Sequence, residues 1–216
     1  MLRPAVLSLA LLGPYLAFAQ SSDTEIHHHN VVFGVGPAIP TGSSSNYLTT
    51  APFIRFGYGY RFNKLFQADF GFEMAFGAAD NQNAELTNFG QVLGGDHEFF
   101  VPMLGGRVYI PLPWNRVSLA IGGGGTHLHY SETAPTGGGY SYGYSSGCLT
   151  CTSRGGWGGY GMGNLSYFLD SSHIFHVGTN VEYVAGSTNG PQVANIPAVK
   201  VTDHWLNVAF EFGLSF

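Results

Sequence analysis

The sequence has few charged residues and no long hydrophobic run after its first twenty positions. Asp, Glu, Lys and Arg make up 10% of the chain, against roughly 25% in an average soluble domain. No window after Gln20 offers about 18 uninterrupted apolar residues, which excludes membrane-spanning helices in that part of the sequence. The 8 basic residues are outnumbered by 13 acidic ones, and this balance argues against nucleic acid as a partner.

Cysteine is scarce as well, because the chain has only Cys148 and Cys151. After export these thiols would meet an oxidising compartment, so a local disulfide is expected. A redox motif would need a thioredoxin-like βαβ setting. Zinc would need a second pair of ligands, for which His127 and His129 are the nearest candidates. We interpret His27–His29 as part of a solvated tail. The sequence therefore predicts no metal site and no cofactor.

The first 19 residues are typical of a cleavable signal peptide. Arg3 supplies the positive charge, Ala5–Leu16 is an interrupted apolar run, and Ala17–Ala19 is a small-x-small cleavage site. We therefore expect an exported chain with a short periplasmic tail over residues 20–29 and one domain over residues 30–216.

Glycine and aromatic residues are abundant instead, and the aromatic residues alternate with polar or small ones. Between Pro52 and Gly77 two consecutive arms each place an apolar residue at every second position: Ile54, Phe56, Tyr58, Tyr60 and Phe62, then Phe66, Ala68, Phe70, Phe72, Met74 and Phe76. A period of two indicates strands with one apolar and one polar face. Each arm has about the ten residues that a tilted membrane strand needs. Because lipid satisfies no backbone hydrogen bond, a membrane protein without spanning helices must be a closed barrel.

The same alternation recurs along the chain and predicts eight strands. The connections between them are short near 63–64, 111–115 and 169–173, and long near 41–50, 78–98, 131–156 and 186–203. Strict alternation of short and long connections is typical of outer-membrane barrels with tight periplasmic turns and long exterior loops. We predict an all-β fold, an eight-stranded antiparallel up-and-down transmembrane β-barrel, with both mature termini periplasmic. A secreted β-sandwich is the alternative.

Three details of this barrel are open to a test. Pro37 and Pro102 would each interrupt a ladder of hydrogen bonds, so we expect them at strand ends or bulges. In the glycine-broken sixth strand, roughly 157–168, Asn164 and Ser166 favour the interior.

The end of the sequence carries a resemblance to a known family. Val208, Phe210, Phe212, Leu214 and Phe216 alternate along the last strand, which finishes on an aromatic residue. This ending resembles the assembly signal of bacterial outer-membrane barrels, and the whole pattern resembles the OmpA/OmpX-type eight-stranded barrel. The resemblance implies the outer membrane of a Gram-negative cell, surroundings of lipid and lipopolysaccharide, and recognition of Phe210, Phe212, Leu214 and Phe216 by the barrel-assembly machinery.

If the aromatic faces contact lipid, the charged faces line the lumen. We expect a neutral network of ion pairs there, made by Arg55, Arg61, Arg107 and Arg116 with Asp69, Glu73, Glu182 and Glu211. A three-residue connection, 63–65, would place Arg55 opposite Glu73, whereas a five-residue connection would pair Arg61 with Asp69. We predict the shorter connection. Because eight strands enclose little more than their own side chains, the lumen should be plugged.

Three functions suit such a barrel. A structural or surface-interaction role is favoured, with the Gly-, Tyr- and Ser-rich loop 131–156 as a candidate surface for a ligand. His129 and Ser131 resemble the His-x-Ser pair of outer-membrane lipid A deacylases. Glu132 stands where that family has Asn, however, and the family's downstream Glu has no counterpart between Glu132 and Asp170. A small passive channel is the third reading. We predict a protein that is not an enzyme.

Overall fold

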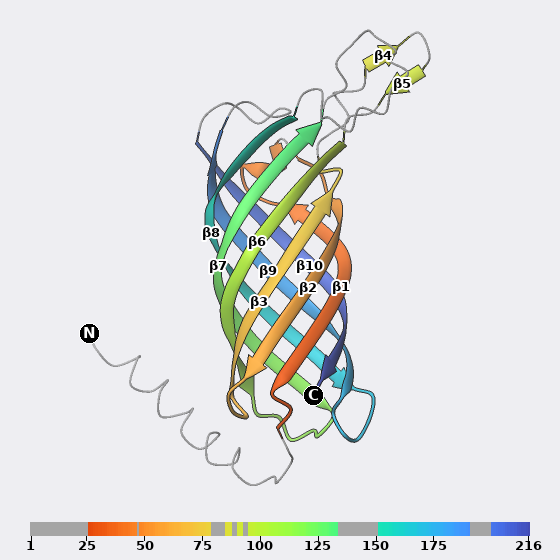
Figure 1. Ribbon diagram of the computed structural model, residues 1–216, viewed down its shortest axis with the longest axis vertical. Coiled ribbons are helices and arrows are strands. Elements are labelled where there is room, and N and C mark those ends of the chain that lie inside the picture. Colours follow the sequence, from red (N-terminus) through yellow and green to blue (C-terminus); the bar gives the residue numbers. More distant parts are fainter. Residues whose placement is uncertain are drawn as a thin grey trace, which may run out of the picture.

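Eight long strands follow one another around a closed ring in the computed structural model (Figure 1). The structure describes residues 26–46, 48–78, 85–87, 90–92, 95–133, 151–190 and 200–216. The strands of the ring are β1 (His29–Pro40), β2 (Ala51–Arg61), β3 (Phe66–Phe76), β6 (Gly95–Ile110), β7 (Val117–Thr133), β8 (Cys151–Phe168), β9 (Phe175–Asn189) and β10 (Val201–Ser215). A 3-10 helix, η1 (Ser44–Asn46), follows β1, and β4 (Glu85–Thr87) pairs with β5 (Gly90–Val92) in a separate sheet. Within these ranges no helix is long and apolar enough to cross a membrane.

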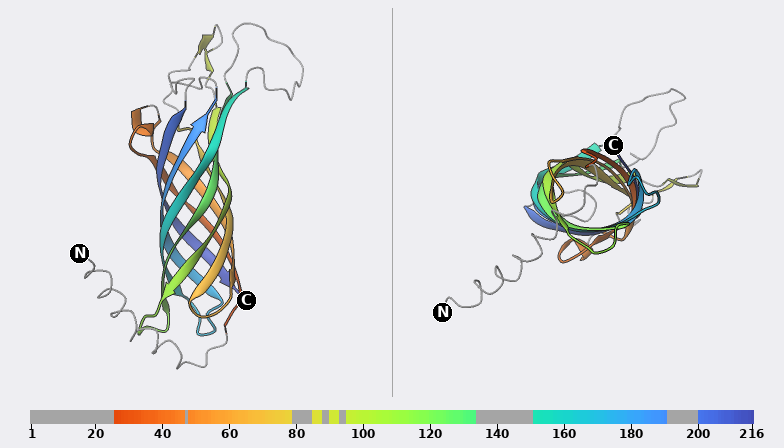
Figure 2. Two further views of the ribbon diagram at one scale, coloured as in Figure 1. Left: turned by 90° about the vertical axis from the view of Figure 1, so that its left-hand side faces the viewer. Right: turned by 90° about the horizontal axis from the view of Figure 1, so that it is seen from below.

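Every strand of the ring pairs antiparallel with the next ring strand along the chain, so that β3 pairs with β6. The ring closes where β1 pairs with β10. Asn30 lies opposite Ser215 and Val35 opposite Phe210 in this closing ladder. The ring is visible along its axis in the right-hand view of Figure 2. The predicted up-and-down barrel is confirmed, since a sandwich would have two separate sheets.

The short turns lie at one end of the barrel, and the strand ends that the longer connections join lie at the other (Figure 1). We call these the turn end and the loop end. The end of β10 and the start of β1 both lie at the turn end.

The alternation in β2 and β3 places aromatic side chains outside and charged side chains inside. Arg55 pairs with Glu73, and Phe56 pairs with Phe72, as the three-residue connection predicts. Phe70 is 49% exposed, whereas Glu73 is fully buried. The phase of β8 is also confirmed, because Asn164 and Ser166 are buried while Trp157, Leu165 and Tyr167 are exposed.

Strands β6 to β10 each extend into residues that the sequence predicts as loops. β6, β7 and β8 have 16, 17 and 18 residues, against 11 in β2 and in β3. The ladder of β7 and β8 continues to Thr133 opposite Cys151. The predicted loops 78–98, 131–156 and 186–203 are therefore too long, because strand pairing continues into glycine-rich and polar sequence that lacks the apolar alternation.

The two prolines differ in their positions. Gly71 pairs with Met103 and Glu73 with Phe100, so residues 101 and 102 form a bulge, as predicted for Pro102. Pro37 lies inside β1, opposite Pro52, and the ladder to β10 skips Gly36 and Pro37 without a register shift. The prediction for Pro37 is therefore wrong. A local gap in the ladder accommodates the missing donor there, so the strand neither ends nor bulges.

Candidate functional site

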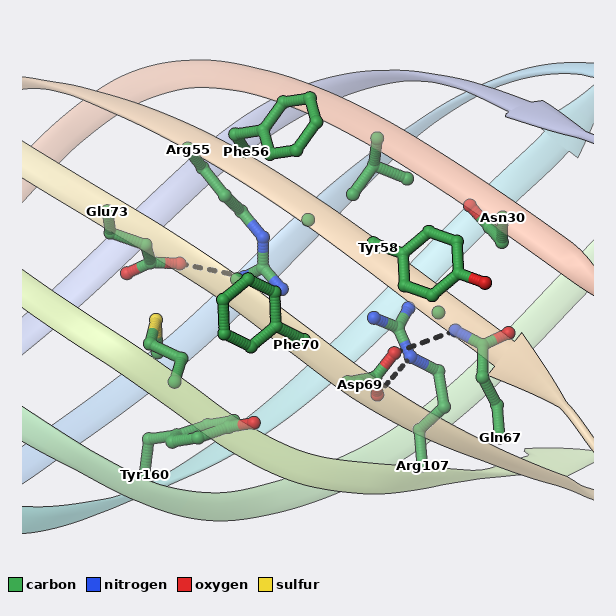
Figure 3. Close-up of a pocket in the computed structure, with 15 residues that line it drawn as sticks. Asn30, Arg55, Phe56, Tyr58, Gln67, Asp69, Phe70, Glu73, Arg107 and Tyr160 are labelled. Carbon is green, nitrogen blue, oxygen red and sulfur yellow. Dashed lines mark hydrogen bonds and ion pairs between the residues drawn. The ribbon is translucent and has the colours of Figure 1, made fainter.

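The middle of the lumen holds one arginine among three glutamates. Arg55, from β2, lies 3.0 Å from a carboxylate oxygen of Glu73, 3.0 Å from one of Glu182 and 3.1 Å from one of Glu211. All four side chains are buried. Figure 3 shows the Arg55 side chain turned toward Glu73 of the neighbouring strand. Since these glutamates come from β3, β9 and β10, this cluster joins the neighbouring strands β2 and β3 to the neighbouring strands β9 and β10, with β1 between the two pairs.

Amide side chains add hydrogen bonds to this central cluster. Asn207 donates through Nδ2 to Glu73 at 3.0 Å, and Asn164 donates to Glu211 at 2.7 Å. Ser166 in turn donates to Oδ1 of Asn164. These neutral donors matter because a buried carboxylate is costly unless its oxygens are hydrogen-bonded.

A second ion pair lies nearer the turn end. Nε of Arg107 donates to Asp69 at 2.8 Å, and Gln67 donates to the other oxygen of Asp69 at 2.7 Å (Figure 3). Tyr109 extends this chain by donating to Oε1 of Gln67. Gly59 lies opposite Asp69, where a Cβ would displace the Gln67 amide from its present position. A cavity of about 10 Å³ remains beside Asp69, which is about the space of one water molecule.

An apolar layer closes the lumen on the loop side of the central cluster. Its side chains are almost fully buried: Phe53, Phe100, Leu128, Tyr130, Val184 and Trp205. The rings of Phe100 and Trp205 meet edge to face at 5.9 Å. Phe53, Val184 and Trp205 have the same parity in their strands as Arg55, Glu182 and Glu211, so the sequence contained a signal for part of this layer that our prediction did not use. The bulge at residues 101 and 102 reverses the parity between Phe100 and Arg107 and hides that signal in β6.

A third polar group lies beyond the apolar layer. Arg154 is buried and donates to Oγ1 of Thr188 at 2.8 Å, and Thr188 donates to Asp203. Sequence reasoning missed Arg154 because it assigned residues 131–156 to a loop. The parity of Asn164 and Ser166 extends back to position 154 and would have identified it.

Two arginines of the predicted network lie elsewhere. Arg61 is at the turn end, with its guanidinium 3.6 Å from the centroid of the Tyr109 ring. Arg116 is exposed in the turn between β6 and β7. The predicted neutral balance is therefore wrong. Among the described side chains, the buried charges are those of Arg55, Arg107 and Arg154 against Asp69, Glu73, Glu182, Asp203 and Glu211. Both misplaced arginines are at strand ends, where a long side chain can reach water instead of the lumen.

Solved structures share this architecture, although no protein-family model and no curated protein matches the sequence. The crystal structure of Neisserial surface protein A (NspA) aligns with a TM-score of 0.55 and 10% identity, covering 87% of this chain and 97% of that one. This chain has the fold of a small outer-membrane β-barrel.

Two other outer-membrane barrels also align with the chain. The attachment invasion locus protein Ail of Yersinia pestis has a TM-score of 0.46 and 14% identity, covering 87% of this chain and 100% of that one. The N-terminal β-barrel domain of Pseudomonas aeruginosa OprF has a TM-score of 0.47 and 9% identity, covering 89% and 100%. At such low identities the likeness concerns the fold.

The candidate deacylase pair lies on the outer face of the outer-membrane barrel. His129 and Ser131 both project outward from β7 near the loop end, where His129 pairs with Gly155 and Ser131 with Ser153. His127 lies on the same face, edge-on to Trp157 at 5.0 Å. Among the described residues no group of three or more His, Cys, Asp or Glu could hold a metal ion.

Some predicted features lie outside the described residues. They include the signal peptide 1–19 and Cys148, and of Cys151 only the backbone is described, as the start of β8. The disulfide and the cleavage site therefore remain predictions. Phe210, Phe212 and Leu214 do lie on the outer face of β10, and Phe216 directly follows that strand. Their recognition by an assembly machinery remains a prediction too.

The three adjacent histidines are attached to the turn end of the barrel. His27 hydrogen-bonds to the carbonyl oxygen of Ser172, His28 to that of Arg61, and His29 to the hydroxyl of Tyr58. The interpretation of His27–His29 as a solvated tail is therefore wrong, because backbone pairing with β2 extends to His28. This pairing places the ring of His28 against Tyr60 and the ring of His29 against Tyr58.

An ordered turn connects β8 to β9. The Asp170 carboxylate accepts hydrogen bonds from the backbone N–H groups of Ile174 at 3.1 Å and Phe175 at 2.8 Å. Desolvation acts to raise the pKa of Asp170, but these N–H groups outweigh it and hold the pKa below its ordinary value.

Proposed function

We propose that the chain is an integral protein of the bacterial outer membrane with a closed lumen. Its role is structural or surface-interacting, and it is exerted from the loop end. The observation that carries this proposal is the filling of the lumen by the Arg55 cluster and by the apolar layer around Trp205. A solute would have to break buried ion pairs and displace packed rings to pass, so transport is a poor explanation for this interior.

The outer face supports the membrane location. Many large apolar side chains are exposed there, among them Phe33, Phe56, Phe66, Phe70, Leu104, Ile121, Leu165, Val181, Phe210 and Phe212. Among the strand side chains that the structure describes, every Asp, Glu and Arg except Arg61 is buried. A surface of this kind is stable in hydrocarbon and would aggregate in water.

Planar-bilayer recordings test the closed lumen. The refolded barrel should give no frequent, stable conductance steps, while a wide porin in the same bilayer serves as the positive control. Large and reproducible steps from this chain would show that the lumen opens, and would favour the channel reading.

Cysteine labelling tests the orientation. In a background of Cys148→Ser and Cys151→Ser, a Ser43→Cys variant places a thiol at the loop end and a Ser172→Cys variant places one at the turn end. The side chains of both serines are exposed on the surface of the folded chain. A membrane-impermeant maleimide should label whole cells only at position 43. Labelling at position 172 alone would reverse the proposed orientation.

Deletion of part of the third long loop tests the surface role. The ladder of β7 and β8 ends with Thr133 opposite Cys151, so removal of residues 136–149 leaves both strands intact. Binding of cells to host surfaces should fall, whereas replacement of 191–199 by an equally long Gly/Ser segment serves as the control. Unchanged binding would leave only the structural role.

We assign no reaction to the chain. The shared outer face of His129 and Ser131 keeps the deacylase reading testable. Release of fatty acid from lipid A by the purified barrel, abolished by Ser131→Ala, would replace our proposal by that activity.

A further inference from the structure

The turn end of the barrel opens into a cavity of about 520 Å³. The inner ends of several strands form its floor, including Tyr109 of β6 and Ser118 of β7. Residues of the three short turns also line it: 64 and 65, then 111, 112 and 114–116, then 171 and 173. This mouth is much larger than the space beside Asp69 deeper in the lumen.

The charged side chains that line the mouth are all basic. Arg61, Lys64 and Arg116 line it together with His27 and His173, and no Asp or Glu of the described chain does. The acidic residue of the nearest turn, Asp170, directs its carboxylate to the backbone N–H groups of that turn. The mouth therefore concentrates positive charge on a protein whose formal net charge is −5.

Arg61 is the central cation of this mouth. Its guanidinium stacks on Tyr109, and its buried Nε makes no hydrogen bond within the described part of the chain. Asp69, the acid that could have paired with it, is occupied by Arg107 and Gln67. Arg116, in the turn between β6 and β7, also lines the mouth, and its exposed side chain makes no ion pair with a described residue.

We propose that this mouth binds a phosphate-type oxyanion that carries an organic body. Two guanidinium groups present the planar, forked donors that suit phosphate oxygens. Trp114, Phe168 and Tyr109 supply an aromatic wall for the rest of the ligand. Such an anion could come from the headgroup of an acidic phospholipid or from a soluble phosphate ester, which share this chemistry. The inference goes beyond the closed-lumen proposal and does not require it.

Glycerol 3-phosphate is the probe, titrated into the full barrel in phosphatidylcholine nanodiscs and followed by calorimetry and by tryptophan fluorescence. Binding should saturate, and the fluorescence change should be lost in Trp114→Phe. Arg61→Gln and Arg116→Gln should each weaken binding by roughly tenfold. This is the low end of the effect expected for losing a charge-assisted hydrogen bond, because the mouth is open to water. Lys200→Gln is the matched control, since Lys200 is exposed immediately before β10 begins at the loop end.

The same titration in nanodiscs that also contain phosphatidylglycerol separates the two sources. A lower apparent affinity there identifies the lipid headgroup as a competitor for the mouth, and an unchanged affinity identifies a soluble phosphate ester. No saturable binding in either disc would overturn the proposal. Equal weakening by Lys200→Gln would also overturn it, because that result would mean a general effect of net charge. Heat-modifiable gel mobility of each variant verifies that the barrel has folded.

Discussion

Replacing Arg55 by methionine would leave three buried glutamates without the cation that they share. Removal of one partner of a buried ion pair destabilises a protein by about 3–5 kcal/mol. Arg55 lies within 3.0–3.1 Å of Glu73, Glu182 and Glu211, so we expect a loss at the upper end of that range. Against a typical total stability of about 5–15 kcal/mol, this loss is large. Equilibrium unfolding in urea, with the barrel in lipid vesicles, measures it as a lower midpoint at an unchanged slope.

Arg61→Met is the matched control for this experiment. Arg61 is on the same strand and of the same parity as Arg55, but it stacks on Tyr109 and has no described carboxylate partner. Arg61→Met should lower the free energy of unfolding by about 0.5–1 kcal/mol, the size of a cation–π contact. Adding Glu182→Gln to Arg55→Met should recover part of the stability, because one fewer unpaired carboxylate remains. If Arg55→Met and Arg61→Met lowered the free energy of unfolding by similar amounts, the central cluster would not stabilise the barrel as we propose.

Two further predictions concern the outer wall and the turn end. Phe70→Arg, near the middle of β3, should destabilise the barrel by about 2–4 kcal/mol in lipid, as expected for a cation placed against hydrocarbon, whereas Phe70→Leu should be nearly neutral; equal stabilities would mean that Phe70 does not contact lipid. The pKa of Asp170 is lowered in the folded chain, so its stabilising effect is present above the ordinary value of 3.8 and is lost as the pH falls through the lower folded value. Asp170→Asn should remove that part of the acid dependence in urea unfolding, and parallel curves for variant and parent would contradict it.

Local parity explains which contacts could be predicted from the sequence. The pairing of Arg55 with Glu73 follows from counting residues across one short turn. The contacts of Arg55 with Glu182 and Glu211 cross the interior of the barrel, and alternation along a strand gives no information about reach across the lumen. The partner of Asp69 was equally hidden, because a long connection separates β3 from β6 and leaves their register undefined by the sequence.

Most of the side chains that the sequence analysis misplaced lie near the ends of strands. Arg61, Arg116 and Arg154 each lie near a boundary, where a shift of a few residues moves a side chain between wall, lumen and water. Alternation could not define the boundaries at the loop end, because outside the apolar belt glycine and polar residues pair as well as aromatic ones. The histidines at 27–29 were misplaced for a related reason, since backbone pairing with β2 extends beyond the alternating sequence.

Closure between β1 and β10 has a consequence for how the chain folds. The ring is complete only when Asn30 pairs with Ser215, so this ladder joins positions at opposite ends of the described sequence. Contacts of such long range make folding slow, because the entropy of ordering the intervening chain is lost before they form. Until that moment the sheet has two open edges with unpaired backbone groups, which invite pairing with other chains. The barrel is therefore most vulnerable to misassembly during its last step, and protection of β1 until β10 arrives should matter more than protection of any inner strand.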